Sequence, residues 1–285
     1  MQRSLNFAYH QIPFYKSFYG KQPLLRSFED FKKIPILERD ALKNLFASVE
    51  HRRGPVVSSG GTSGMVIKVK TTPDCLGLEW AHIHHLWKQH GFSSADTLLT
   101  MMGKKLRDGC YIKYNPTYNE YQIDPYRFDE LSCEELITAL YRYNTTFNLH
   151  GYPSNILRFF KKCGQTEVGK EFLYSAIKGV YLSSEKPSLE LLDILQSYLP
   201  LDKICIWYGL SEQCAFAAGD VSSGEYTVLH SYGYAEISNG DLICTSYNNN
   251  VMPLIRYNSG DKATLVSSSG NILKKFSLNG RSIDY

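Results

Sequence analysis

Three short segments of this sequence carry residue types that could bind a nucleotide. The first is the loop 59–64, where closely spaced glycines would let backbone amides converge on an anion. The hydroxyls of Ser59, Thr62 and Ser63 add hydrogen-bond donors, which suits a polyphosphate. No Gly-Lys-Ser/Thr follows at the spacing of a Walker loop, so that type of phosphate loop is excluded. A flexible surface turn would have the same composition, and this alternative stays open.

The second and third segments each end in a carboxylate. The segment Tyr208-Gly209-Leu210-Ser211-Glu212 follows a predicted strand, and α/β proteins place ligands where such strands end. Tyr208 could stack on a base, and Glu212 could hold a magnesium ion beside phosphates. In the third segment, 256–261, Asp261 follows a glycine turn and could accept both hydroxyls of a ribose. The alternatives are a strand exit with an exposed glutamate and an ordinary hairpin turn.

The composition is that of a globular protein. The chain has 285 residues, 43% of them hydrophobic and 21% charged, with a net charge of +3. No apolar run approaches the roughly 20 residues that a bilayer span needs, and the first twenty residues do not form a signal peptide. The seven cysteines form no CxxC pair, which argues against a disulfide framework and favours a reducing, cytoplasmic location. The only basic cluster, at 104–107, is interpreted as a surface loop, so no nucleic-acid partner is predicted.

The elements that must position these segments follow from periodicity. The first fifty residues favour helices broken by proline, with a capping-box pattern from Ser27 to Asp30. Strands are predicted on both sides of the glycine loop, at 56–57 and 66–70, and a helix at 73–90. Strands and helices then alternate, which indicates an α/β layer with a largely parallel sheet. The expected strands are 98–102, 180–182 and 204–207, and the expected helices are 134–143, 155–162 and 188–198.

After residue 219 the pattern changes to short strands separated by Gly and Asn turns. These strands are expected at 226–229, 241–245, 263–266 and 272–276. The sequence therefore predicts a helical segment at 1–50, an α/β nucleotide-binding region at 51–218 and a β-rich subdomain at 219–285.

Taken in order, these three segments and Gly280-Arg281 near the end of the chain resemble the signature of adenylate-forming enzymes. The resemblance is greatest to the phenylacetate–coenzyme A ligase-like branch, which includes members associated with capsular polysaccharide biosynthesis. It extends over nearly the whole chain through segments similar to that branch's "PFY", "iP", "GYPS" and adenine-side motifs. These segments lie at 12–16, 33–36, 150–154 and 183–185, and the segment 252–257 also matches closely.

The resemblance implies an α/β fold, namely the large N-terminal domain of an adenylate-forming enzyme with layered α/β subdomains and a β-rich subdomain. It also implies that Glu212 coordinates magnesium, that Asp261 binds the ribose, and that Glu212, Thr62 and Arg281 act in catalysis. The full set of residues implied to contact ATP or its magnesium is Ser59, Gly61, Thr62, Ser63, Gly64, Ser184, Glu185, Tyr208, Gly209, Ser211, Glu212, Asp261 and Arg281.

The implied reaction joins a carboxylate to the α-phosphate of ATP, which gives an acyl-adenylate and pyrophosphate. A thiol, from coenzyme A or a carrier protein, or an amine then accepts the acyl group. The acid is expected to be small, and the 21 tyrosines could line a pocket for an aromatic acid, although a tyrosine-rich core explains them equally well.

The sequence departs from the family in two places. Met65-Val66 stands where the family has a residue followed by proline, and the sequence ends at Tyr285, where the family continues into a C-terminal lid domain that supplies a catalytic lysine. That lid domain is therefore expected to be absent, through truncation or in a naturally short member. Two alternatives follow: a non-catalytic paralogue that binds a nucleotide or a partner, and a subunit completed by a separate C-terminal domain.

Several histidines could suggest a different chemistry. His82 and His85 share a helix face, so a metal pair is geometrically possible, but no third ligand accompanies them. These residues, with His84 and His90, are interpreted as scaffold, and His150 and His230 as packed or turn residues. Only Cys214 lies near the position of the zinc site found in some relatives, so no zinc is expected. The lack of a GxSxG motif weighs against a serine hydrolase of that type.

Overall fold

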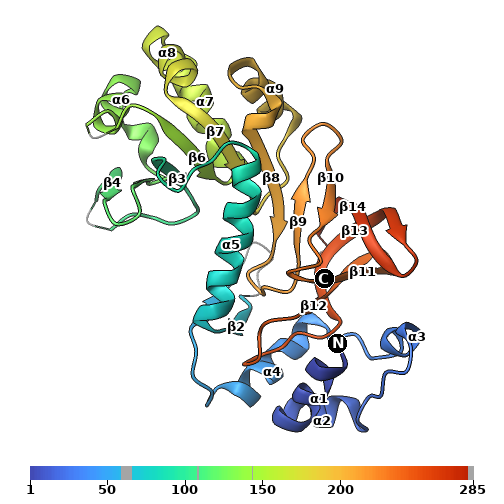
Figure 1. Cartoon of the computed structure of the whole chain (residues 1–285). Helices are drawn as coiled ribbons and strands as arrows, with labels where there is room; N and C mark the ends of the chain where they lie inside the picture. Colours follow the sequence, from blue (N-terminus) through green and yellow to red (C-terminus); the bar gives the residue numbers. More distant parts are fainter. Residues whose placement is uncertain (59–65, 108, 143, 282–285) are drawn as a thin grey trace. The chain divides into compact units, whose positions relative to one another are not determined.

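The computed structural model describes residues 1–58, 66–107, 109–142 and 144–281, with the side chain of Arg281 excepted. It divides the chain into two compact units (Figure 1). The first unit comprises Met1–His82, Tyr208–Gly219 and Ser223–Tyr285, and the second comprises Ile83–Trp207 and Asp220–Ser222. The first 82 residues thus belong with the C-terminal strands, a different grouping from the three successive segments expected from the sequence.

The N-terminal part of the first unit is helical. Proline begins α2, where its missing N–H costs no hydrogen bond, and Ser27 and Asp30 cap α3 reciprocally, as their spacing predicts. A short 3-10 helix, η1, leads into α4. These elements are α1 (Gln2–Gln11), α2 (Pro13–Tyr19), α3 (Phe28–Lys32), η1 (Arg39–Ala41) and α4 (Leu42–Val49).

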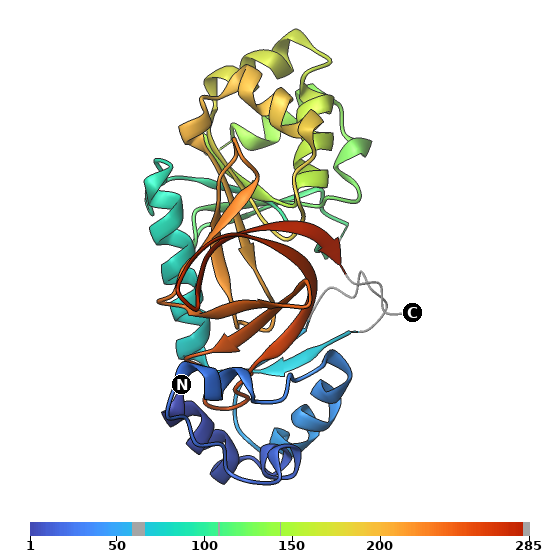
Figure 2. The ribbon, with the colours of Figure 1, turned by 90° about the vertical axis from the view of Figure 1, so that its right-hand side faces the viewer.

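The strands of the first unit are antiparallel. Strands β1 and β2 pair as a hairpin, and the expected phosphate loop between them, 59–64, lies outside the described residues. The remaining strands have the order β11-β12-β13-β14-β10-β9, and register shifts along β13 and β14 accompany the strong curvature of this pair in Figure 2. The predicted β-rich C-terminal region is present. The strands are β1 (Val56–Ser58), β2 (Lys68–Lys70), β9 (Phe216–Gly219), β10 (Glu225–Val228), β11 (Gly233–Ser238), β12 (Asp241–Ser246), β13 (Tyr257–Ser269) and β14 (Ile272–Arg281).

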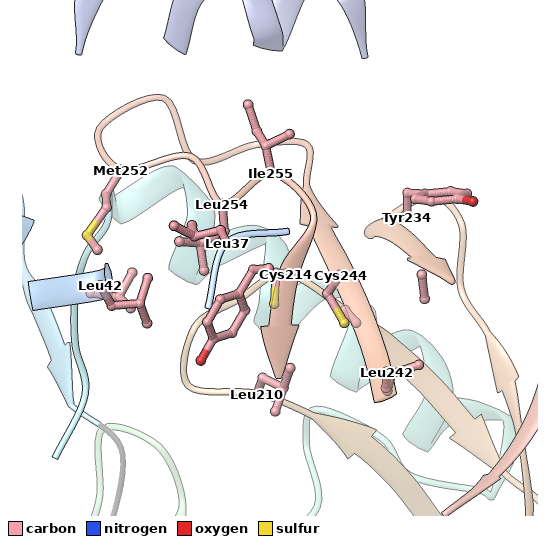
Figure 3. Packing of buried hydrophobic residues seen from close by; sticks show 14 of the residues in the cluster. Leu37, Leu42, Leu210, Cys214, Tyr234, Leu242, Cys244, Met252, Leu254 and Ile255 are labelled. Carbon is pink, nitrogen blue, oxygen red and sulfur yellow. The ribbon is translucent and has the colours of Figure 1, made fainter. Parts of the chain in front are cut away.

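One apolar core joins the helical and stranded parts of the first unit. Leu37 and Leu42, from the N-terminal segment, and Leu210, Leu242 and Leu254 belong to one buried cluster (Figure 3). Complete burial of each such leucine stabilises the fold by about 1.5–3 kcal/mol. Leu37, just before η1, therefore packs in the same core as Tyr257, which belongs to the third predicted segment, 256–261.

The second unit is an α/β layer. Its strands have the order β8-β7-β6-β3-β5-β4, in which β4 and β5 are antiparallel and the neighbouring strands from β5 to β8 are parallel. This arrangement confirms the predicted, largely parallel sheet. The strands are β3 (Leu98–Met101), β4 (Ile112–Asn115), β5 (Glu120–Ile123), β6 (Phe147–Gly151), β7 (Ile177–Leu182) and β8 (Ile204–Gly209), of which the last two residues of β8 belong to the first unit.

Helices accompany these parallel strands and complete the second core. The long helix α5 (Pro73–Gln89) begins in the first unit and continues into the second. The other helices are α6 (Cys133–Leu140), α7 (Pro153–Cys163), α8 (Glu167–Ser175) and α9 (Leu189–Tyr198), and short 3-10 turns lie at Phe128–Glu130 and Leu201–Lys203. In the described part of the chain, no helix has the length and apolar character that crossing a bilayer requires.

Candidate functional site

The second and third predicted segments meet in the first unit through two reciprocal hydrogen bonds. The Tyr208 hydroxyl, at the end of β8, donates to Asp261 Oδ2 in β13 over 2.6 Å. The Tyr257 hydroxyl, at the start of β13, donates to Glu212 Oε1 over 2.8 Å. Each segment therefore contributes one tyrosine and, four residues later, one carboxylate. We call these four side chains the tyrosine–carboxylate clasp.

Burial keeps the two tyrosines of the clasp protonated. Glu212 and Asp261 are 3% and 6% exposed, and Tyr208 and Tyr257 are also buried. Loss of hydration raises the pKa of both hydroxyls well above the usual range, and the negative charges of Asp261 and Glu212 raise the pKa of Tyr208 and Tyr257 further. Both tyrosines therefore act as neutral hydrogen-bond donors.

Arg39 is a site residue that the sequence reasoning missed. It lies in η1 and is 8% exposed, with Nη1 donating to the Ser259 carbonyl oxygen over 2.5 Å. The same Nη1 lies 3.8 Å from Glu212 Oε1. No local signal marks Arg39, because an arginine at the start of a short helix is usually solvated. Its burial follows from the flanking Leu37 and Leu42, which pack into the core.

Gln213, the residue after Glu212, is held by a series of side-chain hydrogen bonds. Gln213 has a positive φ of 55°, a conformation that non-glycine residues seldom adopt. Thr71 Oγ1 donates to Gln213 Oε1 over 2.6 Å, and Gln213 Nε2 donates to Glu79 Oε2 over 2.7 Å. Burial raises the pKa of Glu79. A cavity of about 10 Å³, room for roughly one water, adjoins Gln213.

The remaining predicted residues are placed as follows. The backbone of Arg281, at the end of β14, is in register with Asp261, so these two positions are neighbours across the β13–β14 pair. Gly209 is half-buried and Ser211 is exposed. Ser184 and Glu185 are exposed residues of the second unit, where Glu185 Oε2 accepts a hydrogen bond from the Ser154 amide near the start of α7 over 3.0 Å. Their assignment to the adenine side remains a prediction.

His82 and His150 have structural surroundings that differ from a metal site. His82 contacts the Leu78 carbonyl oxygen at 2.8 Å and Ser231 Oγ at 2.9 Å. His150 is buried among aromatic rings of the second unit, and loss of hydration lowers its pKa to about 3. Within the residues that the structure describes, no group of three or more His, Cys, Asp and Glu side chains could hold a metal ion.

The carboxylate of Glu212 is chemically suited to bind a magnesium ion whose other ligands come from a nucleotide and from water. Magnesium is usually held by one or two carboxylates together with substrate phosphates and waters, so a full cage of protein ligands is not needed. Glu212 would be that carboxylate, as the resemblance implies, with Tyr257 donating a hydrogen bond to its Oε1. When bound, the ion would neutralise charge on the phosphates.

No protein-family model matches the sequence, and no curated protein is similar enough to count as a match. Solved structures do match. An open conformation of 2-hydroxyisobutyryl-CoA ligase, in complex with 2-HIB-AMP and CoA, is 14% identical with a TM-score of 0.65 over 99% of this chain and 73% of that one. The chain shares the fold of this ligase. The GH3.15 acyl acid amido synthetase also matches, with 14% identity, a TM-score of 0.57, and 99% of this chain and 66% of that chain covered.

The structural neighbours are thus CoA ligases and acyl acid amido synthetases. The described elements have the α/β fold that the resemblance implied, and this prediction is confirmed over nearly the whole chain.

Proposed function

We propose that this chain binds magnesium–ATP in its first unit and activates a small carboxylic acid as an acyl-adenylate, for transfer to a thiol or an amine. The observation that carries the proposal is the tyrosine–carboxylate clasp, which joins two segments predicted separately to bind a nucleotide. The fold shared with a CoA ligase supports it.

The two carboxylates suit two different parts of ATP. Asp261 has two oxygens that can accept both ribose hydroxyls, and Arg281 stands beside it in register. Glu212 would hold magnesium near the phosphates, and Tyr208 would pack against adenine. The glycines and hydroxyls of 59–64 would donate hydrogen bonds to the β- and γ-phosphates.

In the proposed reaction an oxygen of the substrate carboxylate attacks the α-phosphorus of ATP. A bond forms between that oxygen and phosphorus, the bond from phosphorus to the bridging oxygen breaks, and pyrophosphate leaves with the electron pair. The protein's part is to position both reactants in line and to stabilise the developing charge. The bound acyl-adenylate then transfers its acyl group to the acceptor and releases AMP.

The narrower assignments also belong to this proposal. Aromatic acids, as in the phenylacetate–coenzyme A ligase-like branch, are the first substrate class to test, and coenzyme A or a carrier-protein thiol is the first acceptor. A role in polysaccharide biosynthesis in the cytoplasm and completion by a complementary subunit are further hypotheses drawn from the resemblance.

Calorimetric titration of magnesium–ATP tests the proposal. Asp261→Ala removes the carboxylate that is proposed to accept hydrogen bonds from both ribose hydroxyls. The affinity for magnesium–ATP should therefore fall by at least about tenfold. Glu190→Ala is a matched control, because Glu190 is an exposed carboxylate paired with Lys161 in the second unit. Equal affinity of the wild-type chain and Asp261→Ala, or no binding by the folded wild-type chain, would contradict the assignment.

A further inference from the structure

Glu212 has a positively charged neighbour that the proposed reaction leaves unused. Arg39 Nη1 lies 3.8 Å from Glu212 Oε1, and the two side chains are only 9% and 4% exposed. The distance exceeds that of a direct hydrogen bond, which is about 2.7–3.2 Å. Arg39 therefore acts on Glu212 as a nearby charge, while the direct hydrogen bond to the carboxylate comes from Tyr257.

Arg39 has contacts other than the one with Glu212. Its guanidinium donates to the Ser259 carbonyl oxygen, and the backbone of Leu37 forms a parallel bridge with Tyr257. Gly260 has a φ of +78°, and a Cβ there would lie 2.9 Å from Arg39 Cδ, so the chain leaves room for this side chain. Arg39 can therefore keep its place when Glu212 takes another cation.

A buried carboxylate needs a compensating charge, and two cations beside one carboxylate repel each other. Arg39 supplies that compensation in the absence of a metal ion. The charge of Arg39 would weaken the binding of a free magnesium ion to Glu212. A magnesium ion bound to nucleotide phosphates would be repelled less, because the phosphates carry negative charge.

We propose that Arg39 is a positioning residue that serves as the resident counter-cation of Glu212 and suppresses binding of free magnesium, so that the site takes up the ion together with a nucleotide. The inference rests on the proposed function, because it takes Glu212 as the magnesium ligand. It extends that function by assigning a role to a residue of the N-terminal segment.

The test is thermal unfolding of the full chain across a series of magnesium chloride concentrations, at constant ionic strength and without nucleotide. Arg39→Gln keeps a donor and removes the charge, so the magnesium concentration that gives half of the Tm increase should fall by about tenfold. Arg39→Lys keeps the charge and should stay within about twofold of the wild-type chain. Arg158→Gln is the matched control, because Arg158 pairs with Asp129 at an exposed position of the second unit.

The double variant Arg39→Gln/Glu212→Gln assigns the effect to the carboxylate, and the gain in magnesium response should be absent from it. Equal half-saturation in the wild-type chain and Arg39→Gln would overturn the proposal, as would a gain that persists in the double variant. If Arg39→Gln folds only with magnesium, that rescue supports the proposal. If it stays unfolded at every magnesium concentration, the proposal fails, because a divalent ion then cannot replace the arginine charge.

The magnesium–ATP titration of the wild-type chain separates this inference from the proposed function. If the Tm of the variants responds to magnesium as expected while the wild-type chain binds no ATP, that result would support Arg39 as the counter-cation of Glu212 and would reject the proposed nucleotide site. If the wild-type chain binds ATP but Arg39→Gln responds to magnesium as the wild-type chain does, the nucleotide site would stand and the counter-cation role would be rejected.

Discussion

The two units bury charge very differently. Among the Asp, Glu, Lys and Arg side chains that the structure describes as buried, only Asp124 belongs to the second unit. The first unit contains the others, which are Arg39, Lys70, Glu212, Glu236, Arg256 and Asp261.

The buried carboxylates of the two units also differ in their hydrogen-bond partners. Asp124 has a local role, since its Oδ2 accepts from the Leu106 amide over 3.0 Å and its Oδ1 from the Tyr126 amide over 2.9 Å. In the first unit, by contrast, Glu212 and Asp261 are held by neutral tyrosine donors. Burying charge costs free energy unless it is paired. The first unit therefore concentrates the buried charged side chains of the described residues, including both carboxylates of the tyrosine–carboxylate clasp.

The largest effect should come from breaking the buried Arg256–Glu236 ion pair of the first unit. Arg256 Nε donates to Glu236 Oε1 over 2.7 Å, and both side chains are buried. Glu236→Leu leaves the Arg256 charge without its carboxylate and should lower the free energy of unfolding by about 3–5 kcal/mol. Denaturant unfolding measures this change.

The matched comparison is the exposed pair Lys161–Glu190 in the second unit, whose side chains are 47% and 55% exposed. Glu190→Ala should cost no more than about 1 kcal/mol, because water screens the pair. If both variants lost the same free energy, burial would not distinguish the two units.

A smaller effect is expected from the second unit under acid. Burial lowers the pKa of His150 to about 3, so the folded chain keeps it neutral while the unfolded chain binds a proton below about pH 6.5. Its contribution to stability is thus fully present above that pH and is lost as the pH falls toward 3, at about 1.4 kcal/mol per pH unit.

His150→Phe keeps a ring in the aromatic cluster and removes the titrating group. The difference in unfolding free energy between this variant and the wild-type chain, measured from pH 7 to about pH 4.5, should shift in favour of the variant. A difference that is independent of pH would show that His150 is hydrated or paired in the folded chain.

Local rules predicted much of the fold. Ser27 and Asp30 form the expected capping box, and the alternation of strands and helices predicted a largely parallel sheet. Strand β6 and the order of the strands were not predicted. Helix α8 was not identified, because Gly169 interrupts its pattern. A Cβ at Gly169 would lie 2.0 Å from the Cys163 carbonyl oxygen, so tertiary packing requires the glycine that local propensity disfavours.

The sequence pointed to some residues of the candidate site and to none of the hydrogen bonds that join them. Glu212 and Asp261 stand in recognisable segments, but their tyrosine partners are 45 and 53 residues away along the chain. Arg39 is farther still from Glu212 in sequence, and its burial depends on packing of the N-terminal helices against the strands. Contacts of this range follow from tertiary structure, which periodicity does not encode.

Hydrogen–deuterium exchange with and without magnesium–ATP tests the central claim most directly, because it reads both units in one experiment. Ligand binding at the tyrosine–carboxylate clasp predicts slower exchange in peptides covering 208–213 and 257–263, with no change in the second-unit helices α6 to α9. No protection of the clasp, or protection confined to those helices, would contradict the assignment of the nucleotide site to the first unit.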